Sequence, residues 1–235
     1  MQKLRLDVLD DIYHLYDDFS KGLTVACKRG CALCCTQNVT MTTLEGHRIL
    51  QYLISTGQRD LLQVIRDTTP RKRFKPVLST NDFAAFCLRG EDPPEEGYDS
   101  SGIACMFLLH DECLIYGQRP FGCRCFFSVR ECAKDASAVV DPFLITVNTV
   151  FLQFIEHIDR GGLFGNMNDV LMFLEPDMHR KHYETQMTSD NTDDTSNIYD
   201  SPGLAQNKPI PALLIPPKHR ERLQPILKKL GELAT

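Results

Sequence analysis

The sequence has no tryptophan and no apolar run near the roughly 18 residues that a membrane span requires. Its first twenty or so residues carry a charge every few positions, so they lack the unbroken apolar segment of a signal peptide. The net charge of -5 gives no general attraction to a phosphate backbone. Together these absences predict a cytoplasmic protein with no membrane span and no nucleic-acid partner.

Cysteine is absent after residue 132, although the chain contains 10 cysteines. They are Cys27, Cys31, Cys34, Cys35, Cys87, Cys105, Cys113, Cys123, Cys125 and Cys132. With 235 residues, 43% of them hydrophobic, the chain can bury a core without cross-links, so this clustering needs a chemical reason. In a reducing compartment, clustered cysteines indicate metal binding or catalysis more often than disulfides.

Helical periodicity accounts for most of the chain. Apolar spacing and capping residues predict helices over about 4–19, from Thr42 or Thr43, over 60–67, over 142–160 and over 217–233. Two apolar runs around a polar turn predict a hairpin over 105–116, and residues 89–102 read as an exposed loop. The fold class is therefore mainly α with irregular cysteine-rich loops and one short β-hairpin.

The same pattern predicts three units. Residues 1–174 form a cysteine-cluster metal-binding domain with an N-terminal helix and packing helices. Residues 175–209 are too polar to bury and form a linker. Residues 210–235 carry a C-terminal helix that docks back through Leu223, Ile226 and Leu230.

The densest cysteine group runs from Cys27 to Cys35, with spacers short enough for one loop to bring several sulfurs to about 2.3 Å from a metal. Cys34 and Cys35 are adjacent, so their side chains project in different directions and suit either ligands of two metals or one ligand and one packed thiol. In the predicted hairpin, Cys105 and Cys113 would face each other. An extended backbone at Cys123-Arg-Cys125 would place both sulfurs on one face.

These blocks resemble the zinc- or iron-chelating family named for its CxxCxxCC motif. The second block runs Cys105-Met-Phe-Leu, then Cys113-Leu-Ile-Tyr, Arg-Pro and Cys123-Arg, and the resemblance spans about residues 27–127. It implies metal ligands at Cys27, Cys31, Cys34, Cys35, Cys105, Cys113 and Cys123, with Cys87 as a further member. The first spacer here has three residues instead of two, and Cys125 and Cys132 lie outside the pattern. Accordingly, Cys34→Ala or Cys113→Ala should lower bound metal, while Cys132→Ala should change little.

Two kinds of centre remain open. The family is distantly similar to flagellin lysine N-methylases, which look like iron-sulfur proteins, so the resemblance implies a 4Fe-4S cluster with redox chemistry or protein-lysine methyl transfer. The alternative is a non-enzymatic zinc protein that serves structure or interaction. The spacing Cys27-x3-Cys31-x2-Cys34 also allows S-adenosylmethionine as a cofactor, although no glycine-rich motif accompanies it. A protein partner or protein substrate would fit, and no catalytic residue is predicted.

Overall fold

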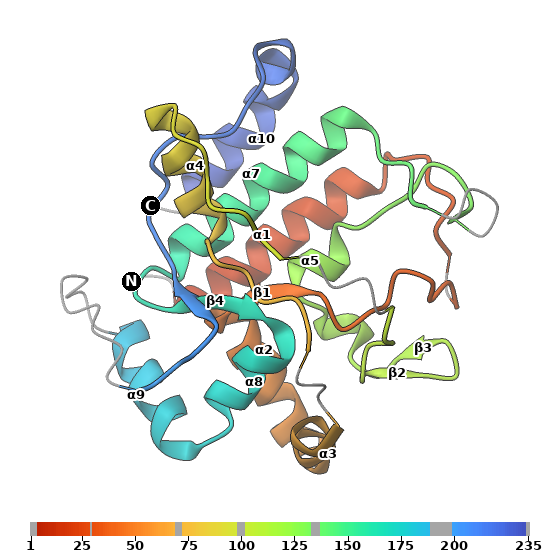
Figure 1. Cartoon of the computed structure of the whole chain (residues 1–235). Coiled ribbons are helices and arrows are strands. Elements are labelled where there is room, and N and C mark those ends of the chain that lie inside the picture. Colours follow the sequence, from red (N-terminus) through yellow and green to blue (C-terminus); the bar gives the residue numbers. More distant parts are fainter. Residues whose placement is uncertain are drawn as a thin grey trace.

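The computed structural model describes residues 4–28, 30–68, 72–97, 102–132, 137–188 and 199–233. Within these ranges the chain is mainly helical, with small antiparallel sheets of two and three strands (Figure 1). This confirms the predicted fold class. None of the helices described is both long and apolar enough to cross a membrane.

Three long helices form the first hydrophobic core: α1 (Arg5–Ser20), α7 (Pro142–Ile158) and α10 (Arg220–Leu233). Figure 1 shows α1 and α7 side by side, with α10 beside them. The Tyr16 ring of α1 meets the edges of Phe121 and Phe151 at centroid distances of 4.7 and 5.0 Å. All three helices were expected from apolar periodicity, and Leu223 and Leu230 bury the last one as predicted.

A second core lies between α2 (Thr43–Ser55), α3 (Asp60–Thr68) and α8 (Met167–Leu174). The capping box predicted for Thr42 and Glu45 is present: each residue accepts a hydrogen bond from the backbone N–H of the other. Glu45 is thus fixed at the start of α2.

A three-stranded sheet in the order β1-β4-β5 joins these parts: β1 is Thr40–Thr42, β4 is Leu163–Asn166 and β5 is Leu204–Gln206. The sequence did not predict it, because strands of three and four residues carry too little alternation to recognise. Part of the predicted linker over 175–209 has regular structure, since Asp177–Thr188 forms α9 and Leu204–Gln206 forms β5. Residues 189–198 of that predicted linker lie outside the described residues.

Helix α4 (Thr80–Arg89) was also not predicted. Ser79 caps its first turn and Gly90 ends it in a left-handed conformation with φ 69°. Glu156 of α7 accepts hydrogen bonds from the Ser79 hydroxyl at 2.6 Å and the Asn81 N–H at 2.8 Å. These contacts hold α4 on the first core, away from the hairpin in Figure 1.

The cysteine-bearing segment contains the expected hairpin, with strands β2 (Leu108–Leu109) and β3 (Glu112–Cys113). Its turn is His110-Asp111, and both residues have positive φ, 50° and 61°, as a tight two-residue turn requires. Cys113 therefore pairs with Leu108, and the predicted pairing of Cys105 with Cys113 is wrong.

Candidate metal centre

Eight of the ten cysteines line one cavity of about 810 Å³ beside the hairpin. They are Cys27, Cys31, Cys34, Cys35, Cys105, Cys113, Cys123 and Cys132. They come from separate stretches of the chain, so the fold has brought distant thiols to one place. All ten cysteines are free thiols.

The two hairpin cysteines are positioned from the second core. Phe107 and Ile115, which are 1% and 2% exposed, anchor the segments on either side of the hairpin. Each also donates its backbone N–H to the sulfur two residues earlier, Phe107 to Cys105 and Ile115 to Cys113. Such N–H donors stabilise a thiolate, the form of cysteine that binds metals.

Cys123 enters the cavity from α5 (Phe121–Arg124), a single helical turn that follows the 3-10 turn η1 (Tyr116–Gln118). The Phe121 ring is buried in the first core, and the Phe121 N–H donates to Glu45 Oε1 at 2.6 Å. Because this segment is helical, residues two apart point to nearly opposite sides. Cys125 accordingly is buried in the core at 7% exposure, and the predicted common face for Cys123 and Cys125 is wrong.

Cys35 lies with Cys105, Cys113 and Cys123 in the cavity lining. Its carbonyl oxygen accepts the Cys105 N–H at 2.8 Å, and the next residue, Thr36, forms a bridge with Ala104. Burial raises the pKa of Cys123 well above its usual value, and the nearby Cys105, Cys113 and Cys35 thiols raise it further. Burial likewise raises the pKa of Cys105 to about 11, with Cys113 and Cys35 adding to the rise.

The remaining sulfurs lie around the other part of the motif. Burial raises the pKa of Cys34 to about 11, and the thiols that add to this rise are Cys35, Cys27 and Cys31. Cys27 is tied to the segment after α5, because its sulfur accepts the Ser128 N–H at 3.3 Å. Cys132, which sequence reasoning left out, lines the same cavity. The one sequence signal for Cys132 is that it is the last member of the cluster of ten cysteines.

Cys87 does not join this group. It is exposed on α4 and is not part of the cavity lining. Cys87 lies there because α4 packs on α7. The sequence analysis did not predict α4, so the position of Cys87 could not be deduced from the cysteine spacing. His110 is exposed in the hairpin turn and also lies outside the lining.

Residues 26–141 match the model of a family named CxxCxxCC and described as "Putative zinc- or iron-chelating domain". This region is similar to that family, and we call it the CxxCxxCC domain below. The match confirms the resemblance drawn from the two cysteine blocks, and it encloses all ten cysteines. The family description supports metal binding by the CxxCxxCC domain. Searches of curated proteins and of solved structures find no match.

The donor set of the CxxCxxCC domain fits a thiophilic metal, because thiolates are the ligands of zinc and of iron-sulfur clusters. Among the residues described, no three His, Cys, Asp or Glu side chains are grouped closely enough to hold a single ion. Ligation of one ion would therefore require the cysteine loops to move inward.

Proposed function

We propose that the CxxCxxCC domain is an iron-sulfur protein, with one cluster held by Cys35, Cys105, Cys113 and Cys123. The observation that carries this proposal is that these four thiols, which come from the motif, the hairpin and α5, line one cavity, with the Cys105 N–H bonded to the Cys35 carbonyl at 2.8 Å. Four cysteinates are the ligand set of a 4Fe-4S cluster.

The size of the cavity favours a cluster over a single ion. Each cysteinate of a 4Fe-4S cluster binds a different iron atom, so the four sulfurs stand farther apart than around one zinc ion. Here the four sulfurs share a cavity of about 810 Å³ with the other four cysteines of its lining, and among the described residues no three ligands are close enough to hold one ion, which suits the larger group.

Burial raises the pKa of Cys105, Cys113 and Cys123, and one nearby basic side chain acts against this effect. Arg119 lines the cavity, and its charge lowers the pKa of Cys113 and Cys123 against the effect of burial. The Arg119 guanidinium lies 3.6 Å from the centroid of the Tyr116 ring, and Tyr116 is 57% exposed. The centre is therefore close to the surface, where a bound cluster, which supplies one-electron chemistry, could exchange electrons with a partner protein.

Isolation of the full chain without oxygen tests the proposal. We expect a brown protein that contains iron and acid-labile sulfide, loses both in Cys113→Ser and keeps both in Cys87→Ser, because Cys87 is exposed outside the cavity. Colourless protein with stoichiometric zinc would replace the proposal with a zinc centre on the same ligands.

A measurement of S-adenosylmethionine binding separates the two activities that the cluster allows. An electron-transfer protein has no need of this cofactor, whereas lysine methyl transfer requires it. We expect no saturable binding to the loaded protein at millimolar concentrations. Saturable binding would favour methyl transfer.

A further inference from the structure

We infer that the domain holds a second metal centre, separate from the first, in which Cys132 is the fourth ligand beside Cys27, Cys31 and Cys34. This inference rests on the proposed function only in that both need thiolate-bound metal. The class of ligand is a thiophilic metal, as a zinc ion or as an iron-sulfur cluster. The grouping of the eight sulfurs and the position of Cys132 carry it.

The motif loop is fixed at two separated points. At its far end the Cys35 carbonyl accepts the Cys105 N–H at 2.8 Å. At its near end the Ala26 N–H donates to the Ser128 carbonyl at 2.8 Å, and the Ser128 N–H donates to the Cys27 sulfur at 3.3 Å. The loop thus runs from the segment after α5 to the segment before the hairpin.

Two turns fold the loop between these points. The Cys31 N–H donates to the Lys28 carbonyl at 3.0 Å, and the Cys35 N–H donates to the Ala32 carbonyl at 2.9 Å. We place the division between the two centres between Cys34 and Cys35. Apart from its chain neighbour Cys35, Cys34 is affected by Cys27 and Cys31, whereas Cys35 is bonded through its carbonyl to Cys105 and affects Cys105, Cys113 and Cys123.

A thiolate-bound metal centre needs four ligands, and Cys27, Cys31 and Cys34 supply three. Cys132 is the remaining cysteine of the cavity lining. Cys132 follows Ser128 by four residues, so it lies on the segment that is bonded to Cys27. The Ser128 hydroxyl donates to the Arg130 carbonyl at 2.6 Å and accepts the Val139 N–H at 3.0 Å. These bonds hold Ser128, Arg130 and Val139 together next to Cys27, and Cys132 lines the same cavity.

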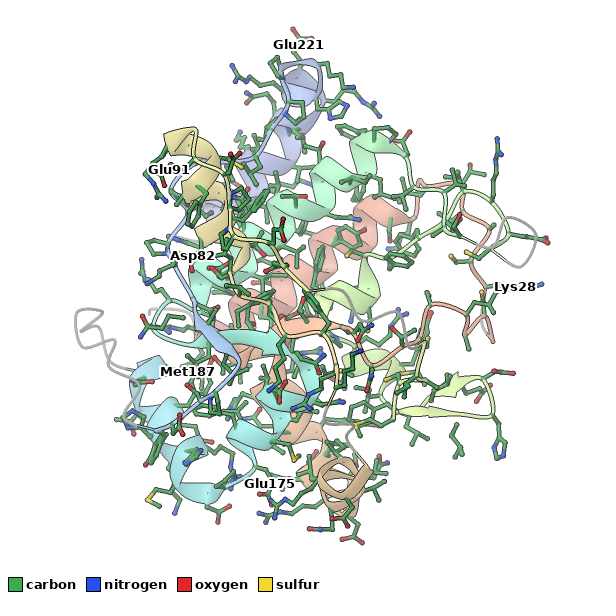
Figure 2. The ribbon with its side chains drawn as sticks, in the orientation of Figure 1. Lys28, Asp82, Glu91, Glu175, Met187 and Glu221 are labelled. Atoms are coloured by element: carbon green, nitrogen blue, oxygen red, sulfur yellow. The ribbon has the colours of Figure 1, made fainter. Side chains whose placement is uncertain are left out.

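Figure 2 shows Lys28 at the edge of the molecule, and Lys28 follows Cys27, whose sulfur accepts the Ser128 N–H of the segment after α5. Lys28 lines the cavity at this group, as Arg119 does at the other. Each set of four sulfurs thus has one cation in its wall, which offsets part of the negative charge of a four-thiolate centre.

The two centres must lie near each other. Consecutive Cα atoms are about 3.8 Å apart and a metal-sulfur bond is about 2.3 Å, so ligation through Cys34 and Cys35 keeps the metals within roughly 14 Å. This short distance between the two metals follows from the adjacency of Cys34 and Cys35 alone.

Metal analysis of four full-length proteins, isolated without oxygen, tests the inference. Iron, zinc and acid-labile sulfide per chain are measured for wild type, Cys132→Ser, Cys113→Ser and the matched control Cys87→Ser. We expect Cys132→Ser to lose one centre and Cys113→Ser to lose the other, while Cys87→Ser keeps both. The identity of the metal lost in Cys132→Ser distinguishes zinc from a cluster.

Two results would overturn the inference and leave the proposed function intact: Cys132→Ser with the full wild-type content, or Cys132→Ser and Cys113→Ser each losing all metal. Metal-free wild type would instead remove the proposed function. Should Cys132→Ser fail to fold, alkylation of wild type decides. We expect at least a tenfold slower alkylation of Cys132 with metal bound than after chelation, with Cys87 equally reactive in both. Equal rates at Cys132 would contradict the inference.

Discussion

Glu45 links the start of α2 to the turn that carries Cys123, and its replacement by alanine tests this link. The side chain is 2% exposed and accepts hydrogen bonds from the Tyr13 hydroxyl at 2.7 Å, the Phe121 N–H at 2.6 Å and the Thr42 N–H at 2.8 Å. In Glu45→Ala these three buried donors lose their acceptor. Each such loss costs about 1–3 kcal/mol, and some of it is recovered by water that enters the space. We therefore expect the free energy of unfolding to fall by about 3–5 kcal/mol.

Urea unfolding in the presence of a chelator measures this cost without any contribution from bound metal. The metal content of the same variant, isolated without oxygen, reports whether the position of Cys123 also depends on Glu45. Because Phe121 begins the helical turn that holds Cys123, we expect Glu45→Ala to bind less than half the wild-type metal at the centre with Cys123. The control is Glu221→Ala on exposed α10 surface, for which the change should stay within about 0.5 kcal/mol. A loss below 1 kcal/mol together with full metal content would refute the role assigned to Glu45.

Three further outcomes are expected. Burial raises the pKa of the Glu156 carboxyl to about 7. Between about pH 4.5 and 7 the folded protein therefore keeps this proton while the unfolded protein releases it. The free energy of unfolding should fall over this range by up to roughly 3 kcal/mol. The difference in unfolding free energy between wild type and Glu156→Gln should follow that slope, and a pH-independent difference would contradict it. In Gly122→Ala the new Cβ would lie 3.0 Å from the Thr40 carbonyl oxygen, so we expect about 1–3 kcal/mol of destabilisation and lower metal content, whereas Gly117→Ala has open space and should match wild type in both measurements. Chelation of loaded protein should lower the thermal midpoint by at least 5 °C, because metal that binds only the folded state stabilises it, and an unchanged midpoint would exclude a structural contribution from the metal.

Helices with long apolar stripes and clear caps could be predicted from the sequence. Asp141 and Pro142 mark the start of α7, and Thr42 with Glu45 marks α2, because these residues act on neighbours within one turn. Helix α4 also has local signals, Ser79 at its start and Gly90 at its end, which the sequence analysis did not use, but its position depends on a distant partner, because Glu156 of α7 accepts a hydrogen bond from the Ser79 hydroxyl. Nothing within the segment 80–89 indicates that contact.

The cysteine site was predictable as a set of candidate residues but not in its arrangement. The hairpin followed from its apolar runs, yet its register depends on the His110-Asp111 turn, whose positive φ values the residue types only permit. Likewise, Cys123-Arg-Cys125 has the alternation of a strand, but the buried Phe121 and its bond to Glu45 draw this segment into a helical turn. Three-dimensional contacts therefore separated Cys125 from the cavity and added Cys132 to it.

X-ray absorption at the iron and zinc edges, on full-length protein isolated without oxygen, tests the proposed iron-sulfur centre most directly. It reports the identity of the metal and of the atoms bound to it in one sample. We predict iron with a first shell of sulfur only and with a second iron atom close by. Zinc surrounded by four sulfurs with no iron present, or iron bound by nitrogen and oxygen, would contradict the account.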